Sequence, residues 1–250
     1  MSTQPSAQLI AVRNVSQIFG APPEEFCALR DVSLTMEEGA FVCVVGPSGC
    51  GKSTLLQIVA GLTAPTTGEV RIDGGKVAGP RPDKIGVVFQ ESLLLPWKTA
   101  AENIEFPLTL CGVPAGERRS RAHALLELVG LLDFANRLPD ELSGGMKRVA
   151  IARALVRHPR VLLMDEPFAA LDEQTRTRMW QELLDIHART RATILFITHS
   201  LIEAVYLGDV VQVMAARPGR FIERIAIDLP RPRNIAMLGS APIAEPEARV

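Results

Sequence analysis

The sequence has few cysteines and no long apolar segment, and each absence excludes a class of protein. Its four cysteines are scattered over 250 residues without a Cys-x-x-Cys spacing, which indicates neither a zinc site nor a disulfide framework. No apolar run approaches the roughly 18 residues that a membrane-spanning helix needs. The first ten residues lack the basic start and the apolar core of a secretory signal peptide. We therefore expect a cytosolic protein.

The chain also lacks an excess of charge of either sign. Lys and Arg number 27 against 28 Asp and Glu, so the formal net charge is −1. This balance gives no overall electrostatic signal for nucleic acid, and we expect no nucleic-acid partner. Hydrophobic residues make up 47% and charged residues 22%, as in an ordinary soluble globular protein rather than a disordered one. At roughly 150 residues per domain, the length predicts one large domain or a domain with a sizeable insert.

Continuous apolar runs alternate with helical patterns along most of the chain. The runs show no polar alternation, so we expect strands that are covered on both faces, as in a parallel sheet. Strands that alternate with helices predict an α/β fold with right-handed crossovers. The predicted buried strands are 41–45, 161–164 and 193–198, and the predicted helices are 52–60, 147–157 and 173–188.

Two further regions depart from this alternation. The first forty residues predict short strands, with brief apolar stretches at 9–12 and 34–36. Residues 100–142 predict a helical insert, since 117–129 reads as an amphipathic helix.

The end of the chain predicts a hairpin and a tail. Residues 210–215 and 221–227 flank Arg-Pro-Gly-Arg at 217–220, where Pro then Gly suits the centre of a type II turn. Residues 230–250 are rich in Pro and Ala, and we expect a loose tail.

A phosphate-binding loop is the strongest single feature of the sequence. Residues 46–53 fit G-x-x-x-x-G-K-[ST] between a predicted buried strand and a predicted helix. Such a loop directs its backbone N–H groups at a triphosphate, while Lys52 reaches the β and γ phosphates and the Ser53 hydroxyl binds Mg²⁺. Cys50 lies in this electropositive loop, a setting that favours the thiolate. The predicted cradle is Gly46, Pro47, Ser48, Gly49, Cys50, Gly51, Lys52, Ser53 and Thr54.

Three ionisable side chains follow predicted buried strands. Asp165 and Glu166 end the run at 161–164, and His199 follows the run at 193–198. Ligands of open parallel sheets bind at the carboxyl ends of the strands. We therefore expect Asp165 to hold Mg²⁺, Glu166 to polarise an attacking water, and His199 to face the same phosphate.

A second glycine signal, Leu-Ser-Gly-Gly at 142–145, opens the helix predicted from residue 147. Ser143 can cap that helix, and Gly144 and Gly145 allow an anion to approach its free N–H groups. Together with the phosphate loop, the acid pair and the terminal His, in this order, the chain resembles the ATP-binding subunit of ABC transporters over about residues 8–228.

The resemblance implies an ABC ATPase fold and further site residues. The fold is a P-loop NTPase core with a parallel sheet and an N-terminal antiparallel β subdomain (8–99 and 143–228), a helical subdomain (100–142) and a tail (229–250). Gln90 is similar to the family's Q-loop glutamine at ATP and Mg²⁺, and Phe19 to the aromatic that stacks on adenine. Asp172 resembles the D-loop residue of the dimer interface. Two subunits then pair head to tail, so that the signature of one completes the ATP site of the other.

The resemblance also narrows the type of transporter. With no membrane-spanning segment in the chain, the pore is expected to be a separate polytopic permease, as in bacterial importers. Leu-Leu-Pro-Trp at 94–97 and Arg-Pro-Gly-Arg at 217–220 are similar to importers of nitrate, sulfonate and taurine. The resemblance implies a peripheral protein at the cytoplasmic face of the inner membrane, which a periplasmic or lipoprotein solute-binding protein serves indirectly. We expect the segment 92–98, with Leu93, Leu94 and Trp97 as its candidate exposed apolar residues, to line a groove that receives a short permease helix.

Two departures from the family pattern concern the signature and the terminal His. The stretch from Met146 to Val149 is one residue short, and one residue turns a helix by about 100°. Either the signature loop or the following helix must absorb this change. Ser200 stands where Asp commonly follows the switch histidine, and we expect a mild effect.

Other functions stay open at this point. The chain could be a soluble ABC ATPase that acts outside transport, or the ATPase of an importer for an unrelated small solute. A kinase or GTPase with the same phosphate loop would leave the Leu-Ser-Gly-Gly run and His199 unexplained. Copurification with a polytopic membrane protein separates the transporter from the other classes.

Overall fold

The structure is a computed structural model that describes residues 8–142, 144–234 and 237. Its chain divides into two compact units. The first unit comprises Met1–Arg81 and Arg191–Val250, and the second comprises Pro82–Thr190. The predicted phosphate loop and the predicted hairpin both belong to the first unit.

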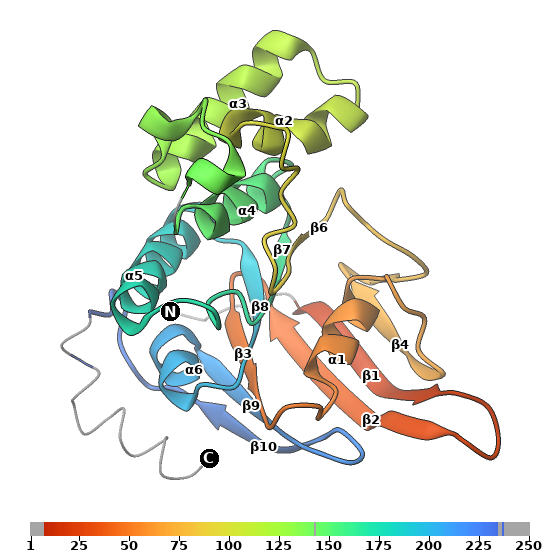
Figure 1. Cartoon of the computed structure of the whole chain (residues 1–250). Coiled ribbons are helices and arrows are strands. Elements are labelled where there is room, and N and C mark those ends of the chain that lie inside the picture. The colour runs from red at the N-terminus through yellow and green to blue at the C-terminus, as the bar shows by residue number, and fades with distance from the viewer. Residues whose placement is uncertain (1–7, 143, 235–236, 238–250) are drawn as a thin grey trace, which may run out of the picture. The chain divides into compact units, whose positions relative to one another are not determined.

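A mostly parallel sheet forms the core of the first unit (Figure 1). Within this unit its strands follow the order β10-β9-β3-β8, and β3 runs parallel to both neighbours, β8 and β9. Every residue of β3 and β8 is buried, as their unbroken apolar sequences predict. The parallel α/β core is thus confirmed. The elements are β3 (Phe41–Val45), α1 (Lys52–Val59), β8 (Thr193–Thr198), α6 (Leu201–Leu207), β9 (Val210–Ala215) and β10 (Arg220–Ala226).

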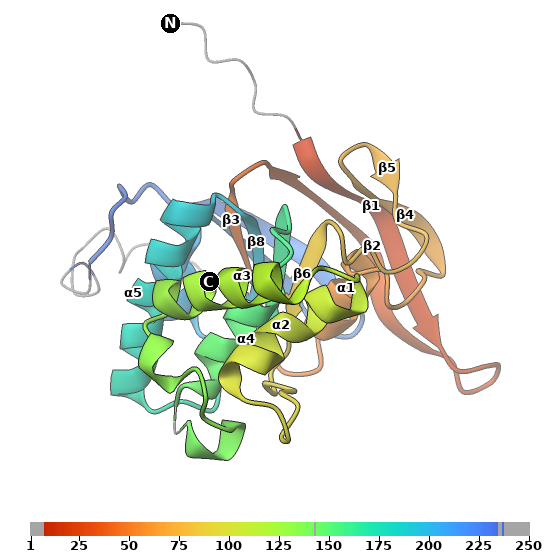
Figure 2. The same cartoon turned by 90° about the horizontal axis from the view of Figure 1, so that it is seen from above.

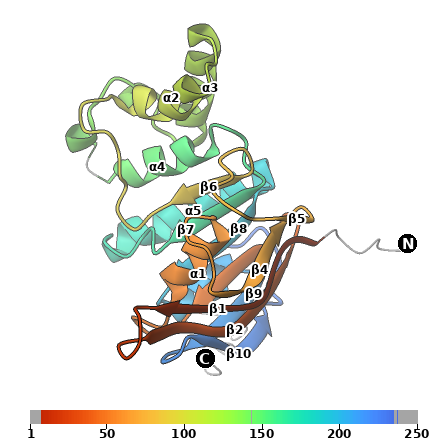
Figure 3. The ribbon, with the colours of Figure 1, turned by 90° about the vertical axis from the view of Figure 1, so that its right-hand side faces the viewer.

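An antiparallel sheet forms the rest of the first unit, with the strand order β2-β1-β4-β5 (Figure 3). The prediction of short, broken strands is wrong here, because β1 and β2 each run for 12 residues. Irregular pairing explains the error: the register shifts between Val12 and Val15, and Asn14 and Asp31 have φ values of 47° and 48°. Such bulges interrupt the polar alternation by which a long strand is recognised. The strands are β1 (Gln8–Phe19), β2 (Phe26–Glu37), β4 (Thr67–Ile72) and β5 (Gly75–Lys76).

The described residues of the second unit form two parallel strands and four α-helices. Strands β6 and β7 pair in parallel, and helices α2 and α3 lie side by side and pack on α4 (Figures 1 and 2). A capping box of Thr99 and Glu102 starts α2. No helix among the described residues combines the length and apolarity needed to cross a membrane. The elements are β6 (Ile85–Val88), α2 (Ala100–Leu110), α3 (Ala115–Leu128), α4 (Met146–Leu155), β7 (Val161–Asp165) and α5 (Glu173–Thr190).

The predicted late hairpin exists, but its turn is not of type II. A type II turn requires a positive φ at Gly219, whereas the left-handed residue is Arg217 with a φ of 59°. Gly219 is instead held in an extended bridge to Leu29 of β2. This long-range pairing determines the local backbone, which is why the Pro-Gly pattern misled the turn assignment.

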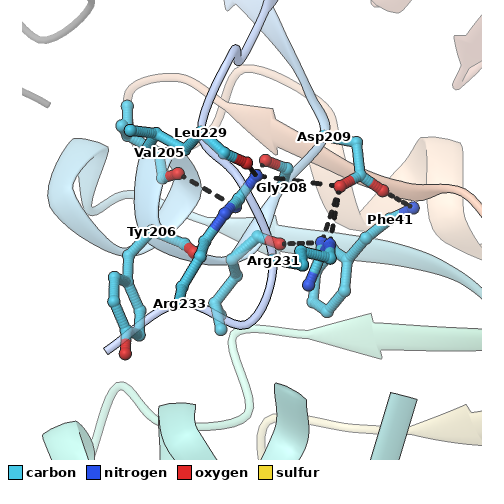
Figure 4. A network of polar contacts seen from close by, with 9 residues as sticks. Phe41, Val205, Tyr206, Gly208, Asp209, Leu229, Arg231 and Arg233 are labelled. Atoms are coloured by element: carbon cyan, nitrogen blue, oxygen red, sulfur yellow. Dashed lines mark hydrogen bonds and ion pairs between the residues drawn. The ribbon is translucent and has the colours of Figure 1, made fainter. Parts of the chain in front are cut away.

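The prediction of a loose tail from residue 230 is wrong for the first residues of that segment. Arg233 is only 2% exposed and donates hydrogen bonds to the carbonyl oxygens of Tyr206 and Gly208, each at 2.8 Å (Figure 4). Arg231 donates to Asp209 at 2.7 Å. Burial, followed by the charge of Arg231, lowers the pKa of Arg233 to about 10. Pro and Ala are frequent in this segment, but Arg231 and Arg233 fix its first residues to the end of α6.

Candidate functional site

The phosphate loop joins β3 to α1 in the first unit. Glycine is required at Gly51, the residue before α1, because its φ is 98°. Lys52 is 5% exposed, and its Nζ donates to the carbonyl oxygens of Gly46 at 2.8 Å and Pro47 at 3.1 Å. The ammonium group therefore lies against the loop, where it can exchange these carbonyl contacts for phosphate oxygens.

Cys50 does not have the reactive character that the sequence suggested. Its side chain is 1% exposed, and its Sγ lies 3.9 Å from the Nζ of Lys52. Burial raises the pKa of the Cys50 thiol, and the charge of Lys52 offsets this rise only in part. The expectation that the site favours the thiolate is therefore wrong, because desolvation outweighs the neighbouring positive charge.

Within the first unit, His199 lies at the same sheet edge as the start of the phosphate loop. The parallel register pairs Val45 with Thr198, so Gly46 and His199 each follow directly from these neighbouring positions. His199 is exposed. The predicted adenine-stacking residue Phe19 ends β1 opposite Phe26 and is 42% exposed, which leaves a ring face available to a ligand.

Hydrogen bonds of the two residues that flank His199 fix the turn around it. The Thr198 hydroxyl donates to the buried Glu203 carboxylate and accepts from the Ser200 N–H at 3.0 Å. The Ser200 hydroxyl accepts from the Glu203 N–H at 3.3 Å and so caps α6. Serine and aspartate are about equally good caps, which explains physically why Ser200 can replace the more common Asp.

In the second unit, the carboxyl ends of β6 and β7 bring Gln90 and the acid pair to one edge. The register pairs Val88 with Met164, and Gln90 and Glu166 each follow two residues later. Asp165 and Glu166 are half-buried, and Gln90 is exposed. Glu166 has a φ of 41°, and a left-handed backbone at a residue other than glycine is frequently found where function requires it.

Lys147 is a residue that the sequence reasoning missed. Its Nζ donates to the backbone oxygen of Gln90, and so it ties α4 to the segment after β6. Burial lowers the pKa of Lys147. Arg153, two turns further along α4, donates to the oxygens of Ser92 at 2.9 Å and Leu93 at 2.7 Å. Helical spacing could have predicted that Lys147 is buried, because Lys147 lies on the same face of the helix as Ala150 and Ile151, which are both buried.

The signature is described only in part, because Ser143 lies outside the described residues. Gly144 is exposed with a φ of 74°, and Gly145 precedes α4. Helix α4 is continuous from Met146, and the Val149 N–H already donates to Gly145 O at 3.1 Å. Within the described residues, the shortened stretch from Met146 to Val149 is therefore regular helix without a break.

Asp172 is exposed and caps α5, because its Oδ1 accepts from the Thr175 N–H at 2.9 Å. Hydrogen bonds from Thr175 lower the pKa of this carboxyl group. A hollow of about 330 Å³ lies beside the signature glycines in the same unit. Its described lining includes Glu141, Arg148 and Arg178, so charged groups of both signs border it.

The predicted Mg²⁺ ligands supply hard oxygen donors, which this ion prefers. They are the Ser53 hydroxyl in the first unit, and the Asp165 carboxylate and the Gln90 amide oxygen in the second. Among the described residues, no group of three or more His, Cys, Asp or Glu side chains is arranged to hold a metal. Mg²⁺ typically takes one or two carboxylates and completes its shell with substrate phosphates and water, so the chemistry of each of these donors suits the ion.

The chain is similar to a known protein family and to individual members of it. The family model described as ABC transporter matches residues 29–169. The nitrate import ATP-binding protein NrtD of Synechocystis sp. is 47% identical, covering 88% of this chain and 83% of NrtD. The taurine import ATP-binding protein TauB of Rhizobium johnstonii is 49% identical, covering 82% and 78%.

Solved structures agree with this assignment. A dimeric ATP-binding cassette in a post-hydrolysis state, bound to ADP and Pi, is similar with a TM-score of 0.77 and 36% identity. The match covers 87% of this chain and 98% of the cassette. The predicted family and the predicted fold are therefore both confirmed. The chain belongs to the ABC transporter family and is an ATP-binding, ATP-hydrolysing subunit of that family.

Proposed function

We propose that the chain hydrolyses MgATP to drive the import of a small anionic solute, of the nitrate, sulfonate or taurine kind, through a separate membrane permease. The similarity to NrtD and TauB, over more than three quarters of each, is the observation that carries the solute class. The chain then acts as a peripheral protein at the cytoplasmic face of the membrane. A solute-binding protein delivers the anion to the permease on the other side.

ATP binds through its phosphates to the loop of residues 46–54, while Phe19 stacks on the adenine. Lys52 gives up its two loop carbonyls for the β and γ phosphates. Ser53, Gln90 and Asp165 provide oxygen ligands for Mg²⁺. When bound, the ion neutralises charge on the β and γ phosphates.

Hydrolysis uses Glu166 as the general base. Its carboxylate takes a proton from water as the water oxygen bonds to the γ-phosphorus. The bond from that phosphorus to the β–γ bridging oxygen breaks, and ADP, inorganic phosphate and one proton are the products. His199 contacts the γ-phosphate, and Asp165, occupied by Mg²⁺, leaves the base role to its neighbour.

Two subunits pair head to tail. In this arrangement Ser143, Gly144 and Gly145 of one subunit complete the ATP site of the other, with Asp172 at the interface. The dimeric form of the similar cassette supports a dimer. The exposure of Gly144, beside which an added Cβ would meet no atom within 4 Å, leaves its backbone accessible to a partner.

The permease docks on residues 92–98. Leu93 is 54% and Trp97 is 72% exposed, a large apolar surface for a short loop. Leu94 is half-buried and supports the loop more than it faces outward. The contacts of Arg153 with the oxygens of Ser92 and Leu93 hold the segment to α4.

Copurification of the chain with its permease tests this function. Trp97→Ala should weaken assembly while leaving the affinity for MgATP intact. Leu110→Ala is the matched control, because Leu110 is also exposed, at 73%, but ends α2. ATPase activity of the assembled complex should rise with binding protein loaded with nitrate or taurine. A chain that copurifies with no polytopic protein would instead support an ABC ATPase that acts outside transport.

A further inference from the structure

The tip of the β9–β10 hairpin is built into the first unit. Gly219 is buried, its N–H donates to Ala28 O at 3.0 Å, and its own oxygen accepts from the Arg30 N–H at 2.9 Å. Through these two bonds, Gly219 pairs with Leu29 of β2 in a short parallel bridge. The tip is thus a fixed part of the unit rather than a free loop.

Gly219 also touches the phosphate loop. A Cβ added at Gly219 would lie 2.1 Å from the carbonyl oxygen of Cys50 and 2.8 Å from that of Ala28. Real Cβ atoms essentially never come within 3.0 Å of such atoms, so any side chain would have to move the Cys50 carbonyl by about 0.9 Å. Since the φ of Gly219 is not in the left-handed region, close approach alone requires glycine here.

The two ends of the phosphate loop meet different neighbours, β2 at Gly51 and strand β9 of the hairpin at Gly46. A Cβ at Gly51 would lie 2.6 Å from the Cδ2 of Leu29. At the other end, a Cβ at Gly46 would lie 2.4 Å from the carbonyl oxygen of Met214 in β9. The loop is therefore enclosed by backbone and by one buried leucine, and its shape depends on them.

We infer that the hairpin tip sets the shape of the phosphate loop and that Gly219 is a positioning residue for ATP binding. The inference rests on the proposed ATP site at this loop. The Cys50 carbonyl and the Gly51 N–H belong to one planar peptide group, so a displaced carbonyl rotates that N–H with it. The Gly51 N–H is one of the donors of the cradle, and its misdirection weakens phosphate binding.

Binding of MgATP to Gly219→Ala, with the full chain, tests the inference. We expect the dissociation constant to rise about tenfold or more, which corresponds to roughly 1.4 kcal/mol. Gly79→Ala is the matched control, because a Cβ at Gly79 meets no atom within 4 Å. The rate of Cys50 alkylation without nucleotide should rise in Gly219→Ala, with Cys27 and Cys111 replaced by Ser. If Gly219 had only a structural role, Gly219→Ala would lower the melting temperature. In protein that is still folded, it would then change neither the dissociation constant of MgATP nor the rate of Cys50 alkylation.

A second pair of variants serves if Gly219→Ala does not fold. Leu29→Val withdraws the methyl group that lies against Gly51 and Gly219, without a clash. Leu34→Val is the same change in the same strand at another buried position. Leu29→Val should weaken MgATP binding, and Leu34→Val should not.

These measurements distinguish a failure of the proposed ATP site from a failure of the role of Gly219. If the wild-type chain or Lys52→Ala shows that the loop does not bind ATP, the proposed site fails and this inference with it. If the wild-type chain binds MgATP through Lys52 but Gly219→Ala binds as tightly as Gly79→Ala, only the inference is overturned. Equal affinities of Leu29→Val and Leu34→Val overturn it in the same way.

Discussion

Substitution of Arg233 by Met should destabilise the first unit strongly. Both Nη atoms of Arg233 donate to backbone oxygens: Nη1 to those of Val205, Tyr206 and Gly208, and Nη2 to that of Leu229 (Figure 4). Val205 and Tyr206 belong to the last turn of α6, whose carbonyl groups have no partner within the helix. Met keeps the length and apolar character of the stem but removes every donor.

The magnitude follows from the burial of these groups. Arg233 is 2% exposed, and its charge also lies 3.7 Å from the Asp209 carboxylate, which accepts from the Phe41 N–H at the start of β3. Each buried acceptor left without a partner costs about 1–3 kcal/mol, so losing these bonds together should cost about 3–5 kcal/mol. At about 2–4 °C per kcal/mol for a chain of this size, the melting temperature should fall by about 6–20 °C.

Thermal unfolding followed by circular dichroism measures this effect, without nucleotide. Arg224→Met is the matched control, because Arg224 is exposed on β10, and an exposed substitution changes stability by about 0.5 kcal/mol at most. Equal melting temperatures for Arg233→Met and Arg224→Met would refute the account of the tail as a structural clamp.

The further predictions concern the site. At pH 8, iodoacetamide should alkylate buried Cys50 more slowly than exposed Cys111, because burial raises the pKa of Cys50 and reaction needs the thiolate; equal rates by mass spectrometry would contradict the burial. Once alkylated, Cys50 should block ATP binding, and prior MgATP should protect it. Lys147→Met should lower ATP turnover more than MgATP affinity, because it frees the backbone at Gln90; unchanged turnover would deny that contact a role. His199→Ala should slow turnover through the loss of a γ-phosphate contact, and turnover equal to wild type would remove His199 from the site.

The parts of the fold that the sequence predicted are those with a local signal. Strands β3 and β8 are recognisable because their apolar runs are buried on both faces. The phosphate loop is recognisable because glycines, Lys52 and Ser53 occur at fixed spacing between a strand and a helix. Each of these depends on neighbours in the chain.

The parts that escaped prediction depend on residues far apart in the chain. The bulges at Asn14 and Asp31 interrupt the sequence patterns of β1 and β2. These bulges arise from the register between the two paired strands, which no single stretch of sequence records. The bridge from Leu29 to Gly219 sets the hairpin turn across 190 positions of sequence, and no local pattern records it. Helical spacing places Lys147 on the buried stripe of α4, but no local pattern identifies its partner, the backbone oxygen of Gln90, which lies 57 residues away.

The Glu166→Gln variant tests the central claim most directly. Gln keeps the shape of the side chain but removes the base, and general-base catalysis typically contributes about 10²–10⁴-fold. ATP should still bind and bridge two subunits, so light scattering should show dimers that persist in ATP.

The decisive measurement is steady-state ATP turnover of Glu166→Gln beside that dimer assay. A monomeric, inactive variant in saturating ATP would locate the defect in the shortened stretch from Met146 to Val149. The account predicts turnover reduced by about two orders of magnitude or more, with ATP-dependent dimers. Turnover close to that of the wild-type chain would contradict it, because the base would then lie elsewhere.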